Sequence, residues 1–269
     1  MNKITALITG SDGFIGSHLV DRLLSDGNIV TGIDNLSSGK LDNLPKDFDL
    51  REMDIRDPGV RHVISEVNPD WIFHLAALAD IVPSITDPDA YFRSNVDGTY
   101  NVLRACQKAN NPRLVYAASS SCYGIPDVYP TPETAEKRPQ YPYALTKFLG
   151  EQLVLHWAQV YKLAATSLRF FNVYGPRSRT SGTYGAVFGV FLGQKLAGKP
   201  YTVVGDGKQT RDFTYVTDVV DALLTAAKAG YVGRVYNVGS GATTSVNTLV
   251  QLLGGDKVHI PKRPGEPDC

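Results

Sequence analysis

The sequence contains little cysteine and has no excess of either charge. Its 269 residues include three cysteines, Cys106, Cys122 and Cys269, whose spacing matches neither a metal site nor an even-numbered disulfide framework and fits a reducing compartment. Lys plus Arg and Asp plus Glu number 27 each, so no overall field draws the chain toward nucleic acid or an anionic membrane. We therefore expect a cytoplasmic protein without a metal, whose partner is a small molecule held by local groups.

Long apolar runs are also missing. No stretch approaches the length that crosses a bilayer, and the N-terminus MNKITALITG passes into a strand pattern without the apolar region of a signal peptide. No repeat or low-complexity tract interrupts the chain. With 43% hydrophobic residues, it has enough apolar surface for one large core, or for one core and a smaller lobe.

Short β-rich runs alternate with amphipathic segments along the first part of the chain. The run ITALIT, a helical face over Ser17 to Ser25 and the run NIVTGID form a βαβ opening. The alternation continues through DWIFHLAA, Asp89 to Asn110, RLVYAAS, Tyr143 to Tyr161 and AATSLRFF. This order predicts an α/β protein with a doubly wound parallel sheet, the Rossmann fold, over residues 1–175. Loops rich in Gly, Ser and Thr then predict a smaller substrate-binding lobe over residues 176–269.

A glycine-rich turn, TGSDGFIG, lies between the first expected strand and helix. Gly10, Gly13 and Gly16 would let bare backbone and a helix N-terminus approach a pyrophosphate. The next strand ends at Asp34, at the distance where a carboxylate binds the adenosine ribose, and Asn35 follows in place of an arginine that could hold a 2′-phosphate. The pattern favours NAD over NADP, although glycines also serve ordinary turns and Asp34 alone could be a cap.

Tyr143 and Lys147 lie four residues apart, on one face of an expected helix. A free phenol has a pKa near ~10, so a phenolate base at neutral pH needs a shift of about three units, or roughly 4 kcal/mol. A nearby ammonium and a positively charged nicotinamide ring could supply it. The alternative is a packed ring beside a solvated lysine. The serines of AASSSCYG, at the end of an expected strand, favour the functional interpretation.

The chain resembles the extended short-chain dehydrogenase/reductase family and, within it, the nucleotide-sugar 4-epimerases of the UDP-glucose (UDP-galactose) type. The resemblance covers essentially the whole chain. It is carried, in this order, by TGSDGFIGSHL, IDNLSSG, DIRD, HLAALA, SNVDGTYNVL, AASSSCYG, YPYALTK, RFFNVYGP, GDGKQTRDFTYVTDV, YNVGSG and RPGEP.

The resemblance implies C4 epimerisation of a nucleotide-diphosphate sugar through a transient 4-keto intermediate. Tyr143 would be the catalytic base and acid, Lys147 its partner and a ribose ligand, and Ser119 the hydroxyl that binds the sugar O4. Besides Tyr143 and Lys147, NAD would contact Gly10, Gly13, Phe14, Ile15, Gly16, Asp34, Asn35, Leu36, Ser37, Ser38, Gly39, Asp54, Ile55, Leu75, Ala76, Ala77, Ala79, Asn95 and Phe171. The substrate would contact Ser119, Ser121, Tyr143, Asn172, Arg211 and Arg263. The family also pairs through two helices, which implies a homodimer.

Two departures from the family bear on the reaction. Relatives that dehydrate the sugar carry an Asp-Glu pair directly after the catalytic Thr, and relatives that decarboxylate a nucleotide glucuronate carry a Glu two residues after it. This chain has Ser120 and Ser121 at those positions, and hydroxyl groups favour plain epimerisation. The family usually continues beyond RPGEP, whereas this sequence ends at Cys269. The tail that helps to close the substrate lobe, and the position that gates N-acetylated sugars, would lie beyond that residue.

Three alternatives stay open. Arg211 and Arg263 could form surface salt bridges instead of binding a diphosphate. The protein could be a nucleotide-sugar reductase or dehydrogenase that releases its cofactor, which a steady change in NADH would reveal. It could also be a catalytically silent dinucleotide-sensing protein on the same fold.

Overall fold

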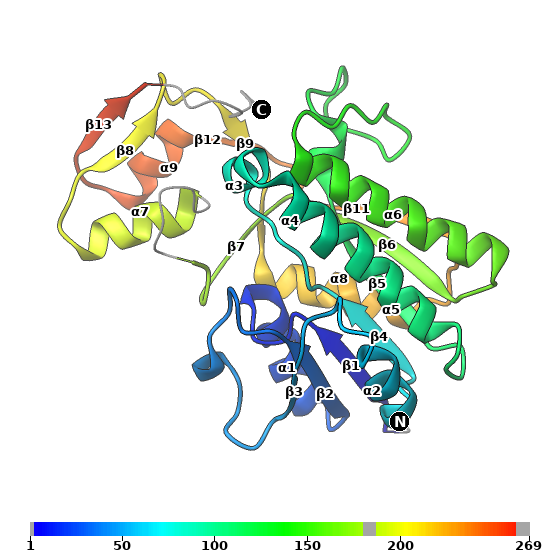
Figure 1. Cartoon of the computed structure of the whole chain (residues 1–269). Coiled ribbons are helices and arrows are strands. Elements are labelled where there is room, and N and C mark those ends of the chain that lie inside the picture. Colours follow the sequence, from blue (N-terminus) through cyan, green and yellow to red (C-terminus); the bar gives the residue numbers. More distant parts are fainter. Residues whose placement is uncertain (1–2, 180–186, 262–269) are drawn as a thin grey trace.

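A seven-stranded parallel sheet forms the centre of the computed structural model, which describes residues 3–179 and 187–261 (Figure 1). The strand order is β11-β6-β5-β4-β1-β2-β3. The strands span Thr5–Thr9 (β1), Ile29–Asp34 (β2), Asp49–Glu52 (β3), Trp71–His74 (β4), Arg113–Ser119 (β5), Ala165–Phe170 (β6) and Arg234–Val238 (β11). The order reverses at β1, and a ligand-binding crevice is expected there, at the carboxyl ends of the strands. The predicted doubly wound fold is confirmed.

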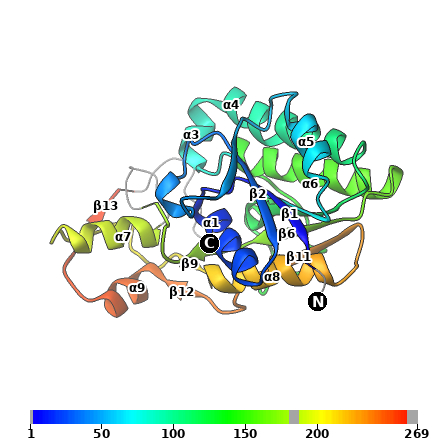
Figure 2. The ribbon, with the colours of Figure 1, turned by 90° about the horizontal axis from the view of Figure 1, so that it is seen from below.

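Helices cover both faces of this sheet (Figure 2). Ala6 and Ile8 of β1 pack into the core beneath one pair of helices, whereas Leu7 points into the core on the opposite face, as the two-residue period of a strand requires. The first face carries α1 (Phe14–Ser25) and α8 (Val216–Lys228), and the second carries α2 (Val60–Val67), α5 (Gly98–Cys106) and α6 (Pro142–Val160). The four strands and two helices expected before Tyr161 therefore lie within two or three residues of their predicted bounds.

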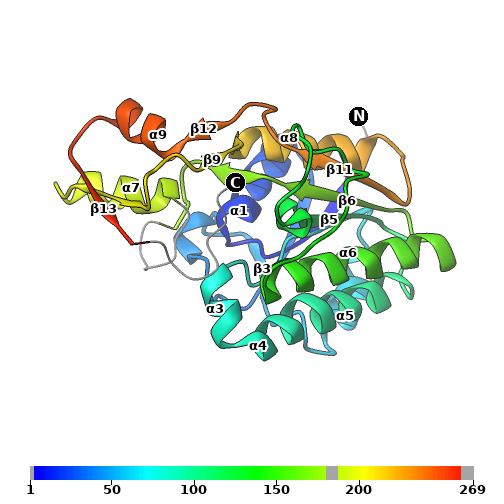
Figure 3. The same ribbon diagram turned by 90° about the horizontal axis from the view of Figure 1, so that it is seen from above.

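A small lobe lies beside the carboxyl edge of the sheet (Figure 3). It has a core of its own, in which Phe191, Tyr201, Val203 and Leu249 are buried together. The lobe consists of α7 (Val187–Leu196), β8 (Tyr201–Val204), β9 (Thr210–Arg211), β12 (Thr244–Ser245), α9 (Val246–Leu253) and β13 (Lys257–Ile260), and the pair β7 (Asn172–Tyr174) and β10 (Phe213–Tyr215) joins it to the sheet. Not all residues after 175 belong to it, because α8 and β11 return to the central sheet.

The segment Asp89 to Asn110, expected as one helix, is broken. It contains α4 (Pro88–Phe92), a π-helical turn η2 (Arg93–Asp97) and α5. The turn brings Asn95 inward, where its side chain accepts from the Leu78 N–H at 2.8 Å and donates to the Leu78 carbonyl at 2.9 Å. These bonds with the chain after β4 offset the weaker geometry of a π turn, and such turns frequently mark functional sites.

Shorter elements complete the described chain: η1 (Leu41–Asn43), α3 (Ile81–Thr86) and η3 (Ser120–Tyr123). Within residues 3–179 and 187–261, no helix combines the length and apolar character needed to span a bilayer, and no group of His, Cys, Asp and Glu is placed to hold a metal ion. Cys106 and Cys122 are buried free thiols, whereas Cys269 lies outside the described residues.

The turn between β1 and α1 requires glycine at two positions for different reasons. Gly10 has φ +75° and donates its N–H to the Ile33 carbonyl at 2.8 Å, so it links the turn to β2 in a left-handed conformation. Gly16 is helical, but a Cβ atom there would lie 2.0 Å from the Gly10 carbonyl oxygen. The first turn of α1 can therefore approach the end of β1 only because Gly16 has no side chain.

We predict that Gly16→Ala destabilises the fold, although alanine favours a helix by about 1 kcal/mol. The added methyl group collides with backbone, which has little freedom to move, so the expected loss is about 3 kcal/mol. Gly27→Ala is the control: it strains a residue with φ +82° but meets no atom within 4 Å, and should cost about 1–2 kcal/mol. Denaturant unfolding of both variants measures the difference, and equal losses would contradict the close approach.

Candidate active site

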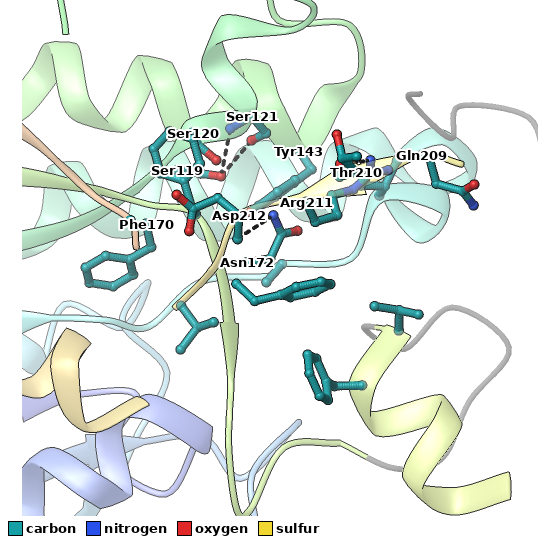
Figure 4. Close-up of a pocket in the computed structure, with 18 of the residues that line it drawn as sticks. Ser119, Ser120, Ser121, Tyr143, Phe170, Asn172, Gln209, Thr210, Arg211 and Asp212 are labelled. Carbon is teal, nitrogen blue, oxygen red and sulfur yellow. Dashed lines mark hydrogen bonds between the residues drawn. The ribbon is translucent and has the colours of Figure 1, made fainter. Parts of the chain in front are cut away.

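A cavity of about 980 Å³ opens between the carboxyl edge of the sheet and the small lobe. Phe14 and Ser38 line it on the side of the glycine-rich turn, and Arg211 lines it on the side of the small lobe. Ser119, Ser120, Ser121 and Tyr143 also line the cavity (Figure 4). Members of the predicted cofactor, catalytic and substrate groups therefore share one cavity, although Gly10, Asp34 and Lys147 do not line it.

Ser119 is the last residue of β5 and stands at the start of η3. Its Oγ accepts the Ser121 N–H at 3.2 Å and lies 2.7 Å from the Ser121 Oγ (Figure 4). A serine that caps a helical turn in this way has a fixed side chain. The local turn thus holds two hydroxyl groups together at the wall of the cavity.

Tyr143 lies in the first turn of α6, where Pro142 begins the helix and the ring of Tyr141 stacks parallel to that of Tyr143 at 6.5 Å. Burial raises the pKa of Tyr143, and hydrogen bonding with Ser119 and Ser121 opposes this effect. The phenol is therefore protonated at neutral pH in the protein alone. A phenolate at this position requires positive charge beyond that of the surrounding chain.

Lys147 lies one helical turn after Tyr143 and is 5% exposed. Its Nζ stands 4.5 Å from the centre of the Tyr116 ring, a favourable position for a cation. Burial lowers the pKa of Lys147 to about 7, while the Glu151 carboxylate acts in the opposite direction. The ammonium is thus near its titration point at neutral pH, and a ligand that favours its charged form will hold it protonated.

His74, at the end of β4, is a buried residue with a structural role. Its Nδ1 lies 2.7 Å from the Thr9 Oγ1 and its Nε2 lies 3.0 Å from the Thr99 Oγ1. Burial lowers the pKa of His74 to about 3, so the ring is neutral. Thr9 also accepts the Ala76 N–H at 3.2 Å, which extends the chain of hydrogen bonds to the backbone that follows β4.

The glycine-rich turn and the end of β2 fit the adenosine half of a dinucleotide. Asp34 accepts N–H groups from Asp12 at 3.2 Å and from Leu36 at 3.0 Å, so its carboxylate is fixed at the strand end. Gly10 leaves backbone bare, since a Cβ there would lie 2.8 Å from the Ala76 nitrogen. Phe14 and Ile15 open α1, whose N-terminus supplies N–H groups for a pyrophosphate.

The other predicted cofactor residues border this half. Asn35 donates to the Asp54 Oδ2 at 2.8 Å, and hydrogen bonds from Arg56 lower the pKa of Asp54 to about 2. Ile55 is buried, with its carbonyl bound by Asn101. The loop after β2 contains Ser37, Ser38 and Gly39. The segment after β4 contains Leu75, Ala76, Ala77 and Ala79, and the backbone of Leu78 in this segment is hydrogen-bonded to the Asn95 side chain.

On the substrate side, Asn172 and Arg211 line the cavity with Phe171. Asn172 donates from Nδ2 to the Asp212 carbonyl at 3.1 Å (Figure 4), and Arg211 donates from Nη1 to the Thr210 carbonyl at 2.8 Å. The guanidinium is thus anchored by the backbone at the cavity wall, where paired donors suit a phosphate. Arg263 lies outside the described residues.

A buried ion pair behind the serines was missed in the sequence. Arg169 donates to the Glu151 carboxylate from Nε at 2.9 Å and from Nη2 at 2.6 Å, and from Nη1 to the Tyr123 hydroxyl at 2.6 Å. The Tyr123 hydroxyl donates in turn to the Asn237 Oδ1 at 2.8 Å. This network joins α6, β6, η3 and β11. The spacing of Glu151, four residues after Lys147, was the available signal.

Fold and site together define a Rossmann-fold enzyme with a Ser, a Tyr and a Lys at the crevice where a dinucleotide binds. The chain belongs to the NAD dependent epimerase/dehydratase family, which matches residues 6–239. It is therefore an NAD-dependent enzyme, as the glycine-rich turn and Asp34 predict.

Several members of this family are similar to the chain over most of their length. A UDP-glucose 4-epimerase of Mycolicibacterium smegmatis is 39% identical over 264 residues, which cover 96% of this chain and 84% of that protein. The structure of UDP-glucose 4-epimerase from Thermotoga maritima with UDP-glucose is similar with a TM-score of 0.93 at 36% identity, covering 98% of this chain and 87% of that one. The Thermus thermophilus UDP-glucose 4-epimerase with NAD gives 0.90 at 35% identity, with coverages of 98% and 88%. Other similar proteins are a decarboxylase and a 5,6-dehydratase.

The buried Lys147 generates a pH-dependent prediction. Its pKa in the folded protein, about 7, is below its ordinary value of 10.5. Between these values the unfolded chain binds the extra proton, so the lysine lowers stability most below pH 7 and not at all above pH 10.5. Lys147→Met should therefore raise the unfolding free energy of the dinucleotide-free protein at pH 6 by about 1–3 kcal/mol, while activity falls.

The measurement is denaturant unfolding from pH 6 to pH 10, with Lys228→Met as the control, because Lys228 is exposed on α8. The control should follow the unsubstituted protein at every pH. Identical pH dependence in Lys147→Met and the unsubstituted protein would show that Lys147 does not carry a lowered pKa.

Proposed function

We propose that the chain is a nucleotide-sugar 4-epimerase that interconverts UDP-glucose and UDP-galactose or a closely similar pair. One observation carries the proposal: hydroxyl groups, those of Ser119, Ser120 and Ser121, line the cavity beside Tyr143. Dehydration needs a base for the C5 proton and an acid for the departing C6 hydroxyl, and serine hydroxyls provide neither near neutral pH.

The carboxylates that line the cavity are engaged elsewhere. Among the described residues these are Asp80 and Asp212. Asp80 pairs with Arg179 at 3.0 Å, and Asp212 accepts the Ser240 N–H at 2.8 Å and the Gly241 N–H at 2.9 Å. Both carboxylates are thus bonded to other groups of the chain, which supports a reaction with Tyr143 as the acid and base.

In this mechanism Tyr143 takes the proton of the C4 hydroxyl and Ser119 orients that hydroxyl. NAD, when bound, supplies an acceptor for the C4 hydride and returns it later. Lys147 would hold the ribose of the bound cofactor, and its ammonium would stabilise the phenolate of Tyr143. Asn172, Arg211 and Arg263 hold the nucleotide diphosphate while the 4-keto sugar turns, so that binding energy is applied away from the reacting carbon. Tyr143 then returns its proton, and C4 is inverted.

The experiment offers UDP-glucose and UDP-glucuronate to the protein in deuterium oxide and follows C4, C5 and C6 by NMR. We expect UDP-galactose from UDP-glucose, with no deuterium at C5, no C6 methyl signal and no carbon dioxide from the glucuronate. Deuterium at C5 or a methyl signal would show that the protein is a dehydratase and not an epimerase. Accumulating NADH would identify an oxidoreductase that releases its product.

Tyr143→Phe tests the assignment of the base. The variant keeps the aromatic packing and deletes one proton-transfer group, so C4 inversion should fall by about 10²- to 10⁴-fold with NAD still bound. Tyr231→Phe, on an exposed loop residue, is the matched control and should retain full turnover. Inversion at the unsubstituted rate in Tyr143→Phe would remove the phenol from the mechanism.

We also infer a homodimer through α5 and α6. Large apolar side chains on or next to these helices are exposed, among them Phe92, Tyr100, Leu145 and Val160, and apolar side chains gathered on one surface are typical of an interface. Sedimentation equilibrium should give twice the mass of the chain. Tyr100→Glu, which places a charge in that surface, should give a monomer.

A further inference from the structure

The carboxyl group of Asp12, in the glycine-rich turn, is buried without a hydrogen-bonding partner. The residue is 1% exposed, and within residues 3–179 and 187–261 nothing bonds to either side-chain oxygen. Its backbone is engaged, because the N–H donates to the Asp34 Oδ2 at 3.2 Å and the carbonyl accepts from the Asn43 Nδ2 at 2.9 Å. A buried unpaired carboxylate is costly, so this group requires an explanation that general packing does not give.

The neighbour that affects the Asp12 carboxyl group is Asp34, whose carboxylate is the expected ligand of the ribose. Burial and the Asp34 side chain together raise the pKa of Asp12 to about 7, and no other described side chain contributes. The Asp34 side chain thus favours the protonated form of Asp12.

The loop after β2 closes over this pair. A Cβ atom on Gly39 would lie 2.1 Å from the Asp12 Oδ1, and the Lys40 N–H reaches the Asp12 carbonyl at 3.4 Å. The backbone of the loop thus rests directly on the Asp12 side chain. In a Rossmann fold the carboxylate at the position of Asp34 binds the ribose hydroxyls, so a 2′-phosphate would approach the two carboxyl groups.

We propose that Asp12 is a second determinant of the preference for NAD over NADP, acting with Asp34 to exclude a 2′-phosphate. A ribose hydroxyl donates to the pair, whereas a phosphate brings further negative charge and no donor. Either residue alone maintains the exclusion. If Asp34 loses its charge, Asp12 loses the neighbour that kept it neutral and becomes the carboxylate; if Asp12 is replaced, Asp34 remains.

Equilibrium competition of NADP against bound NAD tests this arrangement in Asp12→Asn, Asp34→Asn and the double variant. Asp26→Asn, an exposed carboxylate at the end of α1, is the control. We expect each single variant to keep the ratio of the two dissociation constants within about threefold of the unsubstituted protein. The double variant should shift that ratio toward NADP by at least tenfold more than the product of the two single effects.

Three outcomes would overturn the proposal: Asp34→Asn alone reaching the ratio of the double variant, additive single effects, or a double variant that still excludes NADP. Melting temperatures with and without dinucleotide separate these from misfolding. Asp12→Ser with Asp34→Ser repeats the comparison with smaller groups should the asparagine pair fail to fold. If Asp12 merely anchors the loop, Asp12→Asn will lower the melting temperature, and the double variant will have the same dinucleotide ratio as Asp34→Asn.

Discussion

The approach of α1 to the end of β1 is the constraint on which the cofactor side of the molecule depends. Gly16 meets the Gly10 carbonyl at a distance that excludes a side chain, so the helix N-terminus, Asp12 and the end of β2 are brought together in one small volume. The position of the Asp34 carboxylate follows, because it is bonded by the Asp12 N–H of that turn. Packing of one glycine thereby sets the electrostatics of the ribose site.

The catalytic side depends on a different device, the buried pair of Glu151 and Arg169. Their bidentate contact fixes α6 against β6, and α6 carries Tyr143 and Lys147 into the cavity. A buried ion pair of this kind adds little to net stability, but loss of one partner is costly. The pair fixes the position of α6, and the Glu151 carboxylate also favours the ammonium form of Lys147.

The sequence predicts the first half of the fold well because strands and helices there follow the simple periods of two and 3.6 residues. It also predicts the places of Ser119, Tyr143 and Asp34, which lie at the strand ends and helix start that a parallel sheet brings together. It does not reveal that β11 and α8 return to the sheet, because that depends on contacts between distant segments. The π turn at Asn95, and the Asp12 carboxyl group to which no described residue bonds, are equally invisible in the sequence, since each arises from three-dimensional packing rather than from local preference.

The two sides of the cavity have opposite electrostatic designs, and the proposed reaction follows from the difference. The ribose end holds negative charge in Asp12 and Asp34, which suits hydroxyl donors. The sugar end holds neutral hydroxyls and the phenol of Tyr143, whose pKa is raised by burial. Tyr143 therefore becomes a base only when Lys147 is protonated and the bound cofactor adds positive charge. The same phenol then has to return the proton, because the neighbouring serines provide no second acid. The proposed epimerisation takes a proton from the C4 hydroxyl and returns one to the same oxygen, so the phenol suffices among the described residues, whereas elimination of water would need a further base for C5 and an acid for the C6 hydroxyl.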